Sequence, residues 1–333
     1  MILFAIQVLV EIQVLVKTQP SFWFYWFTFC GIIMGGYFVT AASISGLIAI
    51  AAKPKDSILA NSTLANSILA NSILANSTLP NPSSPAKLQT TTNQQKGYQT
   101  IVADIKLSVL SVIFFAFGAA CFMVFYGWGI TKVYTQWQIQ GLPYLFISYF
   151  VVLLLQDTYF YFTHRLFHLP IFFKFVHQGH HRSRPPTPWT FFALEPIEAL
   201  AQASFLLLIT LVIPLHVGVL LGILFTMTIW ATGNHLGFQI VPYSRSSFEW
   251  GRWCIGSAHH LVHHQRYTHH YGLYFTFWDK LLGTQDADYE ANVEAVSSRS
   301  STTVPSKFIH DHGFLNYGFL NYGFLNYGFL GCS

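Results

Sequence analysis

The chain has 333 residues, of which 53% are hydrophobic and 9% are charged, and its formal net charge is +4 at pH 7. Soluble domains carry about 25% charged residues, so this composition excludes an ordinary soluble protein. It predicts an all-α, integral-membrane helical bundle, in which each span needs roughly 20 mostly apolar residues.

The first three long apolar stretches predict membrane spans. They cover residues 22–52, 107–130 and 142–163. A fourth stretch, residues 199–232, is too long for one straight crossing and contains Pro214 near its middle. Because proline interrupts a helix, we expect a helical hairpin that enters and leaves the membrane on one side. His216 is expected to be a polar cap at the turn, and we assign His310 and His312 the same kind of role.

The basic residues orient these spans. If residues 53–106 are cytoplasmic, thirteen Lys and Arg residues between Lys53 and Lys280 lie on that side, against Lys17 and Lys132 on the other. This bias is typical of membrane proteins, and it explains the basic excess without a nucleic-acid partner. The N-terminus does not read as a cleavable signal peptide. The four cysteines show no spacing typical of a disulfide framework or a thiolate metal site.

Short repeats occupy three segments of the chain. Residues 6–17 are a near-duplicate, residues 57–81 repeat a pentapeptide such as SILAN, and residues 313–330 repeat GFLNY. Copies this short bury little surface, so we interpret them as flexible segments rather than a solenoid. The expected divisions are residues 1–52 with the first span, 53–104 as a low-complexity cytoplasmic loop, 105–290 as the domain that carries the chemistry, and 291–333 as a disordered tail.

Four groups of histidines lie on the cytoplasmic side in this topology. In chain order they are His164 and His168; His177, His180 and His181; His235; and His260, His263 and His264. Residues three and four apart share a helix face, so the H-x-x-x-H and H-x-x-H-H spacings can aim two or three rings at one point. Imidazole is the commonest metal ligand. The sequence therefore predicts a histidine-rich cap that binds more than one metal ion.

Further polar residues are candidates for metal binding or for hydrogen bonds to the ligands. They are His259, His269, His270 and Asp157. Asp157 precedes His164 by two helical turns, which places both on nearly the same face of a helix. Because a carboxylate inside a membrane span is costly, we expect Asp157 to hydrogen-bond a ligand imidazole.

The type of ligand leaves the metal open, since imidazole-rich sites suit both iron and zinc. Zinc in the same cage could drive hydrolysis, which makes a zinc-dependent membrane hydrolase one alternative. A non-catalytic metal-binding or transport protein is another. Transport is disfavoured, because a transporter should carry ionisable residues inside several spans and the predicted spans are almost free of them.

All members of the four histidine groups except His235 fall within three longer motifs. These read QDTYFYFTHRLFH (156–168), FVHQGHHRSRPPTPW (175–189) and AHHLVHHQRYTHHYGLYFTFWDKLLGT (258–284). Their order and spacing resemble the sterol desaturase/fatty acid hydroxylase superfamily of membrane di-iron enzymes, and the last two are similar to sterol C-5 desaturases. The chain departs from that pattern at Glu195, where relatives often have histidine, and at His270, where they often have asparagine.

The resemblance implies a fatty acid hydroxylase/sterol desaturase domain within residues 105–290. Its cofactor would be two iron ions held by the nine histidines of the four groups, with O2 as co-substrate. The substrate would be a membrane lipid (sterol-like, fatty acyl or carotenoid) that is desaturated or hydroxylated at an unactivated carbon. Because the sequence has no haem, flavin or nucleotide motif, the electrons are expected from a separate cytochrome, ferredoxin or reductase.

Overall fold

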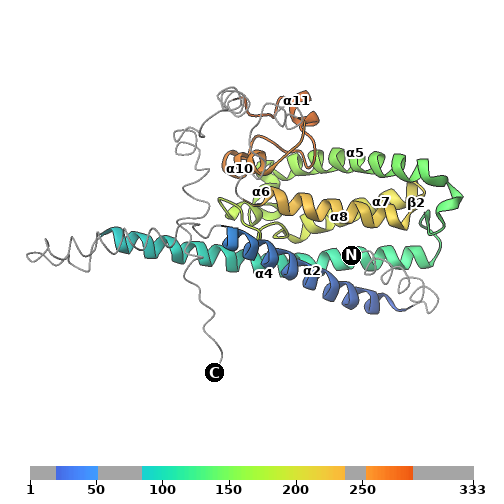
Figure 1. Cartoon of the computed structure of the whole chain (residues 1–333), viewed down its shortest axis with the longest axis horizontal. Helices are drawn as coiled ribbons and strands as arrows, with labels where there is room; N and C mark the ends of the chain where they lie inside the picture. Colours follow the sequence, from blue (N-terminus) through green and yellow to red (C-terminus); the bar gives the residue numbers. More distant parts are fainter. Residues whose placement is uncertain (1–19, 52–84, 237–252, 288–333) are drawn as a thin grey trace, which may run out of the picture.

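The structure is a computed structural model that describes residues 20–51, 85–236 and 253–287 (Figure 1). The three repeat segments, His310 and His312 lie outside the described residues. All of the histidines in the four groups lie within them, as do Asp157 and the three additional histidines.

The described residues are mostly helical, with irregular connecting segments and one very short strand pair. Its α-helices are α2 (Phe22–Ala51), α4 (Pro85–Gly127), α5 (Gly141–Phe167), α6 (Pro170–Val176), α7 (Pro196–Val212), α8 (Val217–Asn234), α10 (Ser257–Arg266) and α11 (Phe277–Leu281). Short 3-10 helices cover Trp137–Ile139 and His180–Arg182. Strands β1 (Val133–Tyr134) and β2 (Leu215–His216) pair in parallel. The all-α prediction is confirmed, because this pair closes one end of the bundle without forming a layer of its own.

Four of the described helices are long and apolar enough to cross a membrane. The spans are Phe22–Ile50, Gly97–Gly127, Gly141–Phe167 and Val217–Asn234, and α7 is a shorter apolar helix. The long helices run side by side as one bundle, which confirms the integral-membrane helical bundle (Figure 1). Two boundaries differ from the sequence reading. Helix α4 already begins at Pro85, where the sequence predicts a loop, and α5 continues to Phe167, so that its last turn includes His164.

Helices α7 and α8 form the predicted hairpin, joined at Pro214 and strand β2. At the turn, the His216 side chain accepts a hydrogen bond from the backbone N–H of Gly218 at 3.0 Å and so caps the start of α8. The other ring nitrogen of His216 bonds the backbone oxygen of Thr135 at 2.9 Å. The expected capping role of His216 is therefore what the structure shows, and it fixes the end of the bundle opposite the other histidines.

The main hydrophobic core lies between α5, α7 and α8. Its buried members are Val152, Leu153, Phe205, Leu215, Val219, Leu220, Ile223, Leu273 and Tyr274. The outward faces of the long helices are also apolar, for example at Phe27 of α2 and Phe146 of α5, which are each 67% exposed. A helix that is apolar on all sides suits a lipid environment. The bundle therefore places its polar chemistry at one end, where α6 and α10 lie (Figure 1).

Candidate metal centre

The nine histidines of the four groups are brought together from five elements. His164 lies in the last turn of α5 and His168 is its C-cap; His177 is the C-cap of α6; His180 and His181 form the following 3-10 turn; His235 is the C-cap of α8; and His260, His263 and His264 lie in α10. Each helix end thus delivers one or more rings to the same region. Segments far apart in the sequence meet there because the bundle aligns their ends.

The two H-x-x-H-H motifs reach this region by different backbone routes. In α10, the three histidines sit on a regular helix and all are buried, as the spacing predicts. In the earlier motif, α6 ends at His177 and a 3-10 turn carries His180 and His181. The helical explanation of the spacing therefore holds for the second motif and not for the first.

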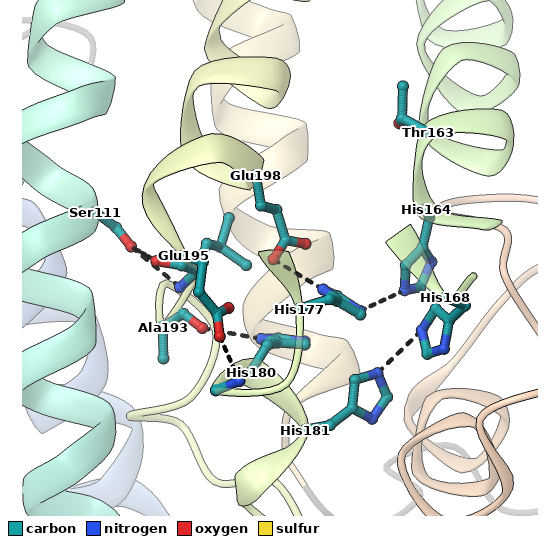
Figure 2. A network of polar contacts seen from close by, with 12 residues as sticks. Ser111, Thr163, His164, His168, His177, His180, His181, Ala193, Glu195 and Glu198 are labelled. Atoms are coloured by element: carbon teal, nitrogen blue, oxygen red, sulfur yellow. Dashed lines mark hydrogen bonds and ion pairs between the residues drawn. The ribbon is translucent and has the colours of Figure 1, made fainter. Parts of the chain in front are cut away.

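Five of the rings form one candidate metal-binding group. His164, His168, His177, His181 and His263 each offer one ring nitrogen, and these atoms all lie within 4.8 Å of one another. Nε2 of His164 is 2.9 Å from Nε2 of His177, and Nε2 of His168 is 3.2 Å from Nε2 of His181 (Figure 2). We call these five residues the first group.

The other four rings form a second group beside the first. His180, His235, His260 and His264 also offer nitrogens within 4.8 Å of one another. Their Nε2 atoms make a close series: His180 to His235 at 3.3 Å, His235 to His260 at 3.0 Å, and His260 to His264 at 3.0 Å. The groups adjoin, since the ring centroids of His181 and His264 are 4.5 Å apart.

The hydrogen bonds of these rings show which nitrogen carries the lone pair. Four rings direct Nδ1 at a backbone oxygen: His164 at Tyr271 (2.9 Å), His180 at Ala193 (3.2 Å), His235 at Ala231 (2.6 Å) and His263 at His269 (2.8 Å). A carbonyl oxygen only accepts, so we assign the proton of each neutral ring to Nδ1 and the lone pair to Nε2. These Nε2 atoms are therefore the ones available to a metal.

This arrangement fits metal ions and is poorly explained without them. The Nε2 atoms of His180 and His235 face each other at 3.3 Å, although both carry lone pairs and neither can donate to the other. Nε2 of His263 is fully buried and has no hydrogen-bond partner among the described residues. Converging lone pairs and a buried polar atom without a partner are costly, and a bound cation would satisfy both.

Glu198 is a functional residue that the sequence reading misses. It lies in the first turn of α7, is 2% exposed, and accepts a hydrogen bond from Nδ1 of His177 at 2.8 Å (Figure 2). A carboxylate on the outer nitrogen of a histidine fixes the ring and makes the other nitrogen a stronger ligand. The sequence signal was available, since Pro196 marks the start of a helix and Glu198 follows in its first turn.

Burial keeps the histidines outside the membrane-spanning segments uncharged. It lowers the pKa of six ligand candidates well below the ordinary value of 6.5: His177, His180, His181, His260, His263 and His264. Neighbouring imidazoles add to this effect, because protonating one disfavours protonating the next. A neutral imidazole is the form that binds a metal ion.

The additional candidates lie near the two groups without joining them. His259 and His270 are buried, and their ring centroids are 5.1 Å apart. His269 contributes its backbone oxygen to Nδ1 of His263, while its own ring nitrogen Nδ1 contacts the Thr268 hydroxyl at 2.9 Å. The residue that departs from the family pattern, His270, accepts a hydrogen bond from the backbone N–H of Asp286 at 3.4 Å.

Asp157 does not make the predicted contact with an imidazole. Its Oδ1 atom instead accepts hydrogen bonds from the backbone N–H groups of Leu273, Tyr274 and Phe275 at 3.2, 2.7 and 3.2 Å. The helical spacing is right, but the face it shares with His164 is covered by the segment 271–275. The Asp157 carboxylate therefore supports the candidate metal centre only indirectly. It holds the segment whose Tyr271 backbone oxygen accepts the hydrogen bond from Nδ1 of His164.

A second buried carboxylate holds the same segment from the other side. Asp279 accepts hydrogen bonds from the backbone N–H groups of Tyr271 at 2.8 Å and Gly272 at 2.9 Å. At Gly272 an added Cβ would lie 2.5 Å from the backbone oxygen of Phe275, so only glycine fits without a shift. Asp157 and Asp279 together bind five consecutive N–H groups, 271–275, and so fix the Tyr271 oxygen that orients His164.

Glu195, where relatives often have histidine, supports the earlier H-x-x-H-H motif. It is the N-cap residue of α7, and its Oε1 atom accepts a hydrogen bond from the backbone N–H of Gly179 (Figure 2). Gly179 lies between His177 and His180, so this contact holds the turn that presents both rings.

The fold and the site define an integral-membrane helical bundle with two adjacent histidine groups at one end, each able to hold a metal ion. Residues 149–284 match the family model described as fatty acid hydroxylase. The matched segment contains all nine histidines as well as Glu195 and Glu198, whereas α2 and α4 precede it. The predicted resemblance to the sterol desaturase/fatty acid hydroxylase superfamily is therefore confirmed.

Curated relatives carry names of sterol-oxidising enzymes. The chain is 33% identical over 144 residues to lathosterol oxidase of Rattus norvegicus and, equally, of Homo sapiens, covering 43% of this chain and 46% of each relative. It is 31% identical over 160 residues to a Delta(7)-sterol 5(6)-desaturase of Gibberella zeae, covering 48% of each chain. The chain thus spans about half the length of the curated relatives it matches. No solved structure gives a significant match.

Proposed function

We propose that the protein is an iron- and O2-dependent oxidoreductase that desaturates or hydroxylates a membrane lipid, with a sterol-like lipid as the first candidate. The observation that carries this proposal is the pair of histidine groups with converging lone pairs at the end of an apolar bundle. The names of the relatives support an oxidative reaction on a sterol. Fatty acyl and carotenoid lipids are the other substrate classes to test.

The donor set supports a pair of iron ions, one in each group. Five imidazoles in the first group and four in the second provide only nitrogen ligands, which suit iron and zinc alike. The relatives' reactions favour iron, because zinc does not change its oxidation state. Iron bound here would accept electrons from an external donor and supply the O2 chemistry that oxidation of an unactivated C–H bond requires.

The chain's own residues position the ligands and exclude water. Nδ1 bonds to backbone oxygens set the ring planes of four ligands, and Glu198 sets that of His177. All nine rings but His168 are buried. A closed, preorganised site of this kind protects a reactive centre from solvent and side reactions. The apolar bundle would bring a lipid to this end of the molecule from within the bilayer.

The proposal also covers the source of the electrons and the side of the membrane on which the metal centre lies. We propose that a separate cytochrome, ferredoxin or reductase supplies the electrons. The excess of Lys and Arg on the histidine side supports a cytoplasmic location for the metal centre.

The decisive experiment measures metal, O2 and product together. Protein purified in detergent and reconstituted with iron should hold two irons per chain and consume O2 only with a reductant and a lipid. Sterols, fatty acids and carotenoids are then supplied in turn, and the product mass is read. Gain of one oxygen atom indicates hydroxylation, and loss of two hydrogen atoms indicates desaturation.

Variants connect this activity to the two groups. His263→Ala and His180→Ala each remove one ligand, and both should abolish turnover while the protein still inserts into membranes. Gln265→Ala is the matched control, because Gln265 is an exposed residue of α10 beside His264. Stoichiometric zinc with hydrolysis that is indifferent to O2, or metal flux into vesicles without lipid oxidation, would replace the oxidoreductase with one of the two alternatives.

A further inference from the structure

Helix α4 carries a stripe of buried polar residues, although it is a membrane-spanning helix. Asp104, Ser108 and Ser111 are each 0% exposed, and their spacing of four and three residues places them on one face. These three residues, which we call the α4 stripe, lie outside the segment 149–284 that matches the family. A buried carboxylate in an apolar helix is costly and needs a specific set of partners.

Most of the hydrogen-bond partners of the α4 stripe lie in the segment that joins the earlier histidine motif to α7, although the Ser111 hydroxyl also bonds the backbone oxygen of Leu107 in α4 itself. Oδ2 of Asp104 accepts hydrogen bonds from the hydroxyls of Ser183 at 2.5 Å and Thr190 at 2.6 Å. The Ser108 hydroxyl donates to the backbone oxygen of Trp189 at 3.4 Å. The Ser111 hydroxyl bonds both the backbone oxygen and, at 3.1 Å, the backbone N–H of Leu194 (Figure 2).

The contact points bracket the residues that hold the metal ligands. Ser183 follows directly after the 3-10 turn His180–Arg182. Ala193, next to Leu194, provides the backbone oxygen that binds Nδ1 of His180 at 3.2 Å. Moving this segment away from α4 would therefore move both the backbone of His180 and the acceptor that orients its ring.

Asp104 is suited to this task because it links two points of the segment at once. A carboxylate only accepts, so one oxygen can fix two hydroxyl donors, and bonds to a charged acceptor are short and strong. Ser183 and Thr190 are seven residues apart in sequence, and both are 0% exposed. Their common acceptor closes the intervening segment into a loop fastened to α4. Helix α4 also packs closely against α7. At Gly118 of α4, an added Cβ would lie only 2.7 Å from Cβ of Ala203 in α7.

We propose that Asp104 is a positioning residue of the metal centre, acting on His180 through Ser183, Thr190 and the segment up to Ala193. On this account, α4 helps to position the metal ligands in addition to crossing the membrane. The inference rests on the proposed metal-binding function of the two histidine groups. It assigns a role in the site to a residue that precedes the family segment altogether.

The test compares Asp104→Ala with the matched control Lys106→Gln in the full chain loaded with cobalt(II), whose visible absorption reports ligand geometry. Lys106→Gln also removes a charge from this turn of α4, but the Lys106 side chain is exposed. Asp104→Ala should change the cobalt spectrum and release cobalt to a chelator about tenfold faster, the lower end of the range for residues that orient metal ligands. Lys106→Gln should match the wild-type chain in both measurements.

Two further variants keep the outcome clear. Thr190→Val removes one hydrogen-bond donor while leaving Asp104 in place, so it should shift the cobalt spectrum in the same direction as Asp104→Ala. In the double variant, Thr190→Val should have less effect than it has in the wild-type chain, because the hydrogen bond it removes is already lost. If Asp104→Ala does not accumulate, Thr190→Val carries the test alone. The inference would be overturned if Asp104→Ala showed the wild-type cobalt spectrum and release rate, even with a lower melting temperature. If only Thr190→Val can be prepared, the same result in that variant would overturn it. A wild-type chain that binds no metal would instead contradict the proposed function.

Discussion

At the scale of single residues, each H-x-x-H-H motif divides its two adjacent histidines between the two groups. His180 belongs to the second group and His181 to the first, whereas His263 belongs to the first and His264 to the second. Consecutive residues in a helical turn point about 100° apart, so neighbouring rings diverge. Each pair of adjacent histidines could therefore contribute one ligand to each of two neighbouring metal ions, as the proposed two-metal centre requires.

The Glu198 carboxylate should determine how tightly the first group binds its metal. In Glu198→Ala the His177 ring loses its Nδ1 acceptor, so metal affinity should fall by about 10- to 100-fold. Glu198→Gln keeps an acceptor without the charge and should lose less. Titration with a competing chelator measures both.

Thr163→Val is the control for these variants. Thr163 precedes His164, but its hydroxyl donates only to the backbone oxygens of Tyr159 and Phe160 in its own helix. Equal losses of affinity in Thr163→Val and Glu198→Ala would mean that the loss does not arise from the hydrogen bond to His177.

At the scale of elements, the sequence predicts what depends on local periodicity. The apolar stretches give the spans, Pro214 gives the hairpin turn, and the spacing of His260, His263 and His264 gives the helical face of α10. The histidines could be identified, since the chemistry of imidazole is carried by the residue type itself.

The parts that could not be predicted depend on contacts between distant segments. Asp157 binds backbone groups 116 to 118 positions later in the chain, and periodicity in α5 holds no information about which loop covers that face. The same is true of the α4 stripe, whose partners lie about 80 residues away. The division of nine histidines into five and four also depends on how the helix ends meet, and no local spacing encodes it.

The loop 271–275 offers a test of how an element supports the site. In Gly272→Ala, the added Cβ would press on the backbone oxygen of Phe275 and on Asp279, so the protein should lose about 1–3 kcal/mol of stability. The Tyr271 oxygen would shift with the loop, and metal should be released faster. Thermal unfolding and chelator release check these two effects.

Gly233→Ala provides the matched control for that variant. Gly233 lies in α8, and an added Cβ would meet nothing within 4 Å. Because alanine favours helix more than glycine does, this variant should be at least as stable as the wild-type chain. A Gly272→Ala protein as stable as Gly233→Ala would contradict the steric explanation.

At the scale of the whole molecule, burying so many histidines makes stability depend on pH. Burial lowers the folded-state pKa of six ligand candidates below 6.5, so the unfolded chain binds more protons. Their contribution is fully present above about pH 6.5 and is lost as the pH falls. The pKa of Asp279 and that of Glu195 are raised by burial, which opposes the trend at lower pH.

The melting temperature of the metal-free protein should therefore decrease from pH 7.5 to about pH 5.5. The metal-loaded protein should release its ions over the same interval, because protons compete for the imidazole lone pairs. Calorimetry and metal analysis at each pH measure the two trends. A melting temperature that is constant across this interval would mean that the folded and unfolded chains bind equal numbers of protons, so that the rings are solvated in the folded state.

Helix α5 connects the lipid environment to the metal centre along a fixed length. From Gly141 to His164 it rises about 35 Å, whereas the hydrocarbon layer of a bilayer is about 30 Å thick. If Gly141 lies at one edge of the hydrocarbon layer, His164 would reach just beyond the other edge, and the depth of a lipid carbon relative to the first group would depend on the local thickness of the membrane. On the proposed lipid-oxidising function, membrane thickness would then help to determine which carbon of the lipid reacts.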